Sequence, residues 1–267
     1  MRLPSSRNGR SRYLRATRIF YPAHVGKPVT ADILDVTRLS TLREITEESD
    51  HWRIGAPATW TDLINAPLPA YFRGLKLAAR EVGGIQIQNA GTIAGKICNA
   101  SPAADGVPAL LALGAEVDLA SLDNTRRLPL GDFILGNRKT RRAPNELVTA
   151  IIPKWQLSTR STFSKIGARK YLLISIAMVS VCLETDPDNV VTRAGIAVGA
   201  CSTVAQRLTS LEKKLIGRPI ALSMAHLDEV SDLEKLSPID DIRAPKEYRL
   251  DAALTRVKRA LRELADE

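Results

Sequence analysis

Residues 82–105 read Val-Gly-Gly-Ile-Gln-Ile-Gln-Asn-Ala-Gly-Thr-Ile-Ala-Gly-Lys-Ile-Cys-Asn-Ala-Ser-Pro-Ala-Ala-Asp, the densest chemical signal in the chain. Small residues at Gly91, Ala94 and Gly95 let backbone N–H groups approach an anion closely, and Thr92 adds a hydroxyl. This pattern is typical of a cradle for a diphosphate. A Gly-rich connection between a helix and a strand explains the same residues without any ligand, and the residues alone leave both interpretations open.

Polar residues follow this run closely. Asn99, Ser101 and Asp105 offer groups that suit a ribose or the edge of a flavin. A P-loop is excluded, because three residues separate Gly91 from Gly95 where four are needed, and Ile97 stands where Ser or Thr would bind magnesium. The chain also has no GxGxxG or GxSxG motif and no His/Cys cluster with metal-ligand spacing.

On either side of this run, short apolar strands alternate with helices in the first half of the chain. Residues 33–36, 52–56 and 116–119 have the composition or the period-two alternation of strands. A helix is expected around residues 75–82, ended by Gly83-Gly84, and another at residues 108–113, with Pro in its first turn and Gly just past its end.

The pattern changes near Pro153. Residues 174–183 and 194–200 are rich in Val, Ile and Ala and flank a turn at residues 186–189, which predicts a hairpin of long strands. Apolar residues at helical spacing then predict a final helix with one buried stripe: Leu250, Leu254, Val257, Leu261 and Leu264. The expected fold class is α+β, with one domain at residues 1–155 and a smaller domain of antiparallel sheet plus helices at residues 156–267.

The composition is that of an ordinary globular protein, with 267 residues, 45% hydrophobic and 25% charged. The formal charge is +9, but seven basic residues and no acidic one precede Asp32, so the rest of the chain carries only +2. That arm permits three interpretations, namely a nucleic-acid contact, an organellar transit peptide or a frayed basic terminus. No apolar run is long enough for a transmembrane helix, and three cysteines without CxxC spacing favour a reducing cytoplasm.

The run at residues 82–105 closely resembles the flavin-binding subunit of the molybdenum hydroxylases, the xanthine dehydrogenase and carbon monoxide dehydrogenase medium-subunit family. The family pattern reads roughly Val-Gly-Gly-x-Gln-Ile-Arg-Asn-x-Gly-Thr-Ile-Gly-Gly-Asn, then Ala-Ser-Pro-x-x-Asp. The resemblance covers about residues 20–267 and continues through further matching segments: residues 136–140, 146–148, 165–169, 196–201, 205–208 and Tyr248-Arg249.

The resemblance implies a two-part FAD-binding domain with mixed sheets, followed by the smaller C-terminal domain. It also implies a cytoplasmic complex in which a large molybdopterin-binding subunit oxidises the substrate and a 2Fe-2S small subunit relays electrons. In this heterotrimer, itself expected to dimerise, FAD passes the electrons to NAD or another acceptor. No catalytic acid or base, no metal ligand and no nucleic-acid partner is implied for this chain.

By the same resemblance, Thr92, Ile93, Ala94, Gly95 and Lys96 lie on the second diphosphate loop of FAD. The resemblance puts Asp105 at the ribose or adenine side, Leu147 near the isoalloxazine, and Lys165, with Arg169 nearby, at the polar edge of the flavin. A cation there stabilises an anionic reduced flavin. Cys98 either faces the ring or is a small buried hydrophobic residue.

The chain departs from the family at the first diphosphate loop, a Leu-Ala-Gly-Gly-Thr-Asp-Phe-like segment. Here residues 14–20 read Leu-Arg-Ala-Thr-Arg-Ile-Phe, without both glycines and the acidic residue, and fewer residues precede them than the family's first strand and helix require. Reading the codons of Ala-Gly-Gly-Thr-Asp one base out of frame gives Arg-Ala-Ala-Arg-Ile, which differs at one residue from residues 15–19. One hypothesis is therefore that residues 15–19 come from a short out-of-frame stretch. The alternative function is that of a degenerate family member, which no longer holds FAD and acts as a scaffold or is a non-functional product. In the second loop, Ala94 replaces Gly and Lys96 replaces Asn.

Overall fold

The computed structural model describes residues 12–14, 33–36, 39–154, 159–169, 173–222, 227 and 231–267. Most of the basic arm and residues 15–20 of the altered first loop lie outside the described residues. Within them, the short strands β1 (Arg12–Leu14) and β2 (Ile33–Asp35) pair in parallel. None of the described helices combines the length and apolar character needed to cross a lipid bilayer.

The first domain is built on a five-stranded sheet whose neighbouring strands all run antiparallel, in the order β3-β4-β9-β5-β6. Its strands are β3 (Ile45–Glu47), β4 (Trp52–Gly55), β5 (Glu116–Ala120), β6 (Thr125–Pro129) and β9 (Leu147–Ile152). A small second ladder joins β7 (Ile134–Gly136) to β8 (Lys139–Thr140). The strands expected near residues 33–36, 52–56 and 116–119 are all confirmed.

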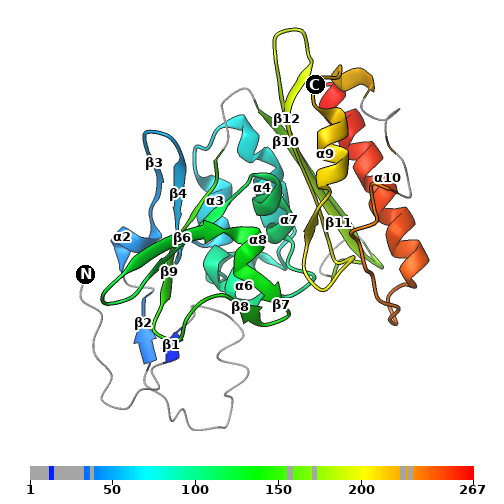
Figure 1. The fold of residues 1–267 in the computed structure, drawn as a ribbon. Helices are drawn as coiled ribbons and strands as arrows, with labels where there is room; N and C mark the ends of the chain where they lie inside the picture. The colour runs from blue at the N-terminus through cyan, green and yellow to red at the C-terminus, as the bar shows by residue number, and fades with distance from the viewer. Residues whose placement is uncertain are drawn as a thin grey trace.

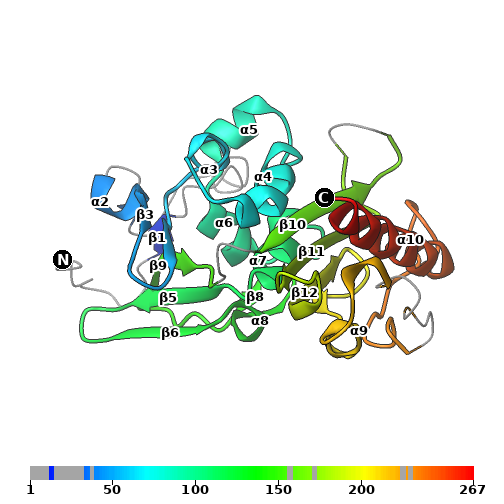
Figure 2. The same ribbon diagram turned by 90° about the horizontal axis from the view of Figure 1, so that it is seen from above.

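Helices α3 to α7 lie together beside this sheet, whereas α2 lies near its outer edge and α8 near β7 and β8 (Figures 1 and 2). The helices of the first domain are α2 (Ser40–Arg43), α3 (Trp60–Asn65), the 3-10 turn η1 (Ala70–Phe72), α4 (Arg73–Arg80), α5 (Ile85–Ala90), α6 (Ile93–Asn99), α7 (Gly106–Ala112) and α8 (Leu130–Phe133). The helix expected at residues 75–82 is confirmed, and its exit turn contains Gly83 at φ +58°, a conformation that favours glycine.

The Gly-rich run is not the connection from a helix to a strand that was one interpretation of it. Residues 85–90 and 93–99 form two consecutive helices, α5 and α6. Gly91 lies between them with an extended backbone, and its N–H donates to the carbonyl of Ile87. The glycine is needed for space, because a Cβ there would stand 2.8 Å from that same carbonyl oxygen.

The second domain is built on a four-stranded antiparallel sheet in the order β10-β11-β12-β13. Its elements are β10 (Arg160–Ile166), β11 (Ala177–Thr185), β12 (Val191–Gly199), β13 (Gln206–Arg207), α9 (Thr209–Leu215) and α10 (Lys246–Ala265). The predicted hairpin is confirmed as β11 and β12, and the predicted final helix as α10. Figure 1 shows this sheet between α4 and α7 on one side and α9 and α10 on the other.

Both faces of this sheet are covered, as the burial of alternate residues of β11 shows. Val179 and Val181 belong to the core shared with α9 and α10, whereas the alternate residues Met178 and Cys182 belong to the core of the first domain. A strand buried on both faces reads as a continuous apolar run instead of an alternation. That is the character of residues 177–183 in the sequence.

The helix–sheet packing across the domains is close. Gly74 of α4 lies against β10, and a Cβ at this position would stand 2.8 Å from the carbonyl oxygen of Thr162. The hydroxyl of Ser161 fixes the same contact, because it accepts from the Gly74 N–H at 2.8 Å and donates to the carbonyl of Tyr71 at 2.6 Å. The two domains therefore share one packed interface through α4 and β10.

We predict that Gly74→Ala destabilises the protein by about 1–3 kcal/mol, although Ala favours a helix by about 1 kcal/mol, because the new methyl group displaces a backbone carbonyl. Urea unfolding of the full chain measures the change. The matched control is Gly131→Ala in α8, where the nearest atom to an added Cβ is Leu111 Cδ2 at 3.8 Å. Equal stabilities for the two variants would contradict the close approach of α4 to β10.

Candidate functional site

The N-terminus of α6 is formed by the residues expected at the second diphosphate loop. Thr92 is the N-cap, and its hydroxyl accepts from the Gly95 N–H at 3.1 Å. The Ile93 N–H donates to the carbonyl of Ala58 at 3.0 Å. Of the first three helical N–H groups, that of Ala94 has no partner among the described residues, so it is the free donor at the positive dipole end of α6.

Asp105 and Lys165 meet although 60 residues separate them in the chain. Asp105 precedes α7, is buried, and accepts from the hydroxyl of Ser175 at 2.7 Å. Lys165 extends from β10, and its Nζ lies 3.5 Å from Asp105 Oδ2. The same Nζ donates to the carbonyl of Glu81 at 3.0 Å and lies 3.5 Å from Glu81 Oε2. This cluster joins the first domain to the second through charged groups.

Lys96 is the second cation of the cluster, on the second turn of α6. Burial is the main cause that lowers the pKa of its ammonium group, the charge of Lys165 adds to the lowering, and Asp105 opposes it. Lys96 forms no ion pair with another described residue. Lys165 thus pairs with the buried carboxylate of Asp105, Lys96 lies near enough for both charges to shift its pKa, and Glu81 lies at the more exposed rim of the cluster.

Leu147 does not belong to this cluster. It is the first residue of β9, paired with Ala120, and is half-buried. The chain before it is fixed by Glu146, which accepts two hydrogen bonds from Arg126, at 2.6 and 2.9 Å. The structure therefore places Leu147 at a strand end in the first domain, next to the Arg126–Glu146 ion pair.

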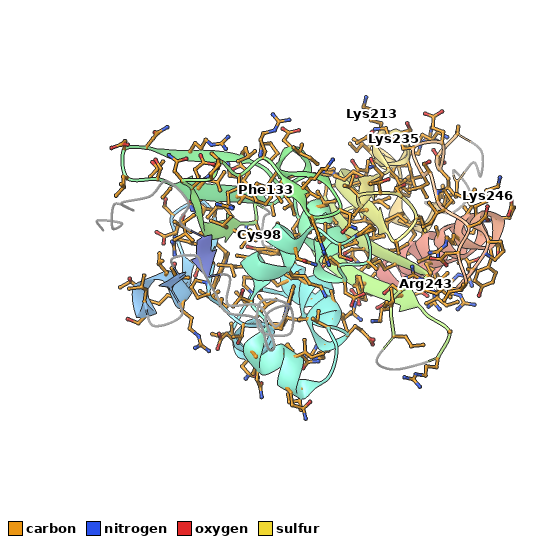
Figure 3. The ribbon with its side chains drawn as sticks, turned by 90° about the horizontal axis from the view of Figure 1, so that it is seen from below. Cys98, Phe133, Lys213, Lys235, Arg243 and Lys246 are labelled. Atoms are coloured by element: carbon orange, nitrogen blue, oxygen red, sulfur yellow. The ribbon has the colours of Figure 1, made fainter. Side chains whose placement is uncertain are left out.

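Two other polar residues of the run are placed by the fold. Asn99 is the last residue of α6, and the hydroxyl of Ser101 accepts from the Ala103 N–H. Cys98 is buried in the core of the first domain (Figure 3). Among the described residues, no group of three or more His, Cys, Asp or Glu side chains is arranged to hold a metal ion.

The sequence did not point to two residues that contact the charged cluster, Glu81 and Ser175. Glu81 stands one residue before the conspicuous run, and its contact with Lys165 depends on how α4 crosses β10. Ser175 lies just before β11, where nothing in the local pattern marks it. Only the pairing of β10 with β11 brings it to Asp105.

Comparison with known proteins identifies the family of the chain. Residues 21–155 match the model of the FAD binding domain in molybdopterin dehydrogenase, and residues 163–264 match that of the CO dehydrogenase flavoprotein C-terminal domain. The chain is 32% identical to the nicotinate dehydrogenase FAD-subunit of Eubacterium barkeri over 77% of this chain and 73% of that one. It is 28% identical to the carbon monoxide dehydrogenase medium chain of Hydrogenophaga pseudoflava, over 86% and 80%.

A solved structure of carbon monoxide dehydrogenase from Hydrogenophaga pseudoflava superposes with a TM-score of 0.81 at 25% identity, covering 94% of this chain and 88% of that one. The two sheets with their covering helices therefore define the two-domain fold of a flavoprotein subunit. The chain belongs to the FAD-binding medium-subunit family of the molybdenum hydroxylases, a family of oxidoreductase subunits. This confirms the resemblance and the fold class inferred from the sequence.

We predict that Ser175→Ala costs about 1–3 kcal/mol of unfolding free energy, because a buried carboxylate loses a hydroxyl donor that water cannot replace. Urea unfolding measures it. The control is Ser121→Ala, whose hydrogen bonds lie in an exposed turn and whose loss changes stability by less than about 0.5 kcal/mol. A cost at Ser175 no larger than at Ser121 would disprove a buried, water-free Asp105.

Lys96 gives a prediction of pH dependence. Burial lowers the pKa of the Lys96 ammonium group in the folded protein, so burying its charge costs folding free energy at any pH below the folded-state pKa. This cost disappears above the ordinary pKa of 10.5, because the amine is then neutral in both the folded and the unfolded state. Lys96→Met should therefore raise the urea midpoint at pH 7, with the gain shrinking as the pH rises toward 10.5. Lys213→Met, on an exposed position of α9, should show no such pH-dependent gain. A gain at Lys96 that is constant with pH would rule out the buried charge as its cause.

Proposed function

We propose that this chain binds one FAD and acts as the electron-transferring flavoprotein subunit of a molybdenum hydroxylase complex. Residues 1–155 would form the FAD-binding domain and residues 156–267 the flavoprotein C-terminal domain. The proposed cofactor-binding residues are those carried over by family resemblance: Thr92, Ile93, Ala94, Gly95, Lys96, Asp105, Leu147 and Lys165.

The observation that carries the proposal is the partly buried ammonium group of Lys96, on α6, which has no ion-pair partner among the described residues and whose pKa responds to the charges of the Lys165–Asp105 pair. An ammonium group that is desolvated without an ion-pair partner is costly. A ligand with a diphosphate and an electron-rich ring edge supplies the missing negative charge. The described residues therefore fit FAD in the chemistry of their donors.

When bound, FAD supplies hydride and single-electron transfer chemistry that no side chain of the chain provides. The residues would hold and orient it. The free Ala94 N–H and the Lys96 ammonium would bind the diphosphate, and Lys165 would keep a positive charge at the polar edge of the ring. Asp105 would hold Lys165 in place, because it accepts from Ser175 and pairs with Lys165 at the same time.

The partners follow from the same family. A large molybdopterin-binding subunit and a 2Fe-2S small subunit would complete the complex, which would dimerise in the cytoplasm, with electrons passing from the iron–sulfur subunit through FAD to NAD or another acceptor. Several relatives support this arrangement by their names, including the medium chain of glyceraldehyde dehydrogenase in Sulfolobus acidocaldarius. No nucleic-acid partner is proposed.

A second candidate rests on the altered residues 14–20, where the family's glycines are missing. Side chains with a Cβ occupy space that glycine leaves for a diphosphate, and they disfavour positive φ. On this account the chain would be a degenerate member that no longer holds FAD and acts as a scaffold or a non-functional product.

We predict that purified full chain reconstituted with FAD binds close to one equivalent, measured as flavin absorbance per chain after gel filtration. Lys165→Ala should weaken FAD binding at least tenfold, which corresponds to about 1.4 kcal/mol, because a buried cation next to the ring is lost. Lys213→Ala, on the opposite face of the C-terminal sheet from α4 and α7 (Figures 1 and 3), is the matched control and should leave binding unchanged.

A folded chain that stays colourless with excess FAD would refute the FAD proposal and favour the degenerate member. Equal loss in Lys165→Ala and Lys213→Ala would show that charge in general, and not this site, controls binding. Circular dichroism of each variant establishes that it is folded.

A further inference from the structure

Glu81 approaches the ammonium group of Lys165 with two different oxygens. Its backbone carbonyl accepts a hydrogen bond from Lys165 Nζ at 3.0 Å, and its carboxylate oxygen Oε2 lies 3.5 Å from the same Nζ. Asp105 Oδ2 also lies 3.5 Å from this Nζ. An ammonium group has three N–H donors. Two oxygens of Glu81 and one of Asp105 are therefore the partners of this cation.

The backbone of Glu81 is fixed by contacts that do not involve its carboxylate. Its N–H donates to the carbonyl of Ala78 at 3.1 Å, and its carbonyl also accepts from the Gly83 N–H at 3.0 Å. Helix α4, which ends just before Glu81, packs beside β10, the strand of Lys165 (Figure 2). Because these contacts belong to the main chain, a substitution of the Glu81 side chain leaves the hydrogen bond from Lys165 to the carbonyl of residue 81 in place.

The two carboxylates that meet Lys165 differ in their surroundings. The Asp105 side chain is 9% exposed and accepts from the Ser175 hydroxyl at 2.7 Å, so it is held in one position. The Glu81 side chain is 38% exposed, so its carboxylate is partly solvated, whereas the Lys165 side chain between them is only 11% exposed. One buried carboxylate and one carboxylate at the rim thus share a single buried cation.

The carboxylate of Glu81 is not needed to hold Lys165 in place. Without it, the ammonium group keeps its ion pair with Asp105 and its hydrogen bond to the carbonyl of residue 81. The carboxylate changes the charge instead, because it puts a second negative group in contact with Nζ. Charges interact more strongly where water is partly excluded, so a group that gains negative charge beside Lys165 is repelled by Glu81.

We propose that the Glu81 carboxylate lowers the midpoint potential of the bound flavin, because it offsets the positive charge that Lys165 presents to the flavin edge. This inference rests on the proposed function, which puts Lys165 at that edge. Two-electron reduction of the flavin to its anionic form takes up one proton and adds one negative charge. A nearby carboxylate disfavours that charge. Glu81 acts through Lys165 and is therefore a positioning residue.

The test is the midpoint potential of the full chain reconstituted with FAD, measured by dithionite titration against a reference dye. Glu81→Gln keeps the size of the side chain and removes its charge. We expect its two-electron equilibrium to favour the reduced flavin about tenfold more than in the parent chain, which corresponds to a rise of about 30 mV. Glu81→Asp keeps the charge, so its potential should stay closer to that of the parent chain than to that of Glu81→Gln.

Glu44→Gln is the matched control. It removes an exposed carboxylate of the first domain, and the carbonyl of Glu44 likewise accepts a hydrogen bond, from the Gly55 N–H at 2.9 Å. Its flavin potential should equal that of the parent chain.

Urea unfolding of the FAD-free chains gives a readout that does not involve the flavin. The change in urea midpoint caused by Glu81→Gln should shrink in a Lys165→Met background, because the carboxylate then has no ammonium group to pair with.

The outcomes separate this inference from the proposed function. A potential of Glu81→Gln equal to or below that of the parent chain overturns the inference alone, and so does an equal rise in Glu44→Gln. A urea shift that is the same with and without Lys165 overturns the coupling between the two side chains. A folded parent chain that binds no FAD overturns the proposed function and this inference together. Circular dichroism shows whether each variant is folded.

Discussion

The C-terminal sheet is the constraint on which the rest of this molecule depends, because it is buried on both faces. One face completes the core of the first domain and the other packs under α9 and α10. A sheet of this kind cannot separate from either layer without exposing a continuous apolar surface to water. The two domains are therefore packed together as firmly as a single core, and residues on either side of the interface keep fixed positions.

This packing fixes the positions of the charged groups between the domains. Asp105 comes from the first domain, whereas Lys165 and Ser175 come from the second, and they meet in a place with little water. A buried pair of this kind adds little net stability, since desolvation offsets attraction. The ion pair instead fixes the position of the Lys165 ammonium group, so that a ligand binding beside it meets a charge at a fixed place.

Much of the fold and part of the site could be predicted from the sequence. The β11–β12 hairpin and the stripe of α10 follow from local periodicity, and Asp105 and Lys165 could be singled out by family resemblance before their contact was known. The two helices in the Gly-rich run were missed. Gly95 has low helix propensity, but the Thr92 cap and the packing of Ile93 and Ile97 outweigh it.

The sequence by itself determined the α+β class, the hairpin, the last helix and the residues that resemble a flavin site, because these depend on spacing along the chain. Only the tertiary structure decided that Glu81 joins Lys165 and that Ser175 joins Asp105. These contacts join residues 84 and 70 positions apart. They depend on how the helices of the first domain pack against the C-terminal sheet, which no local pattern records.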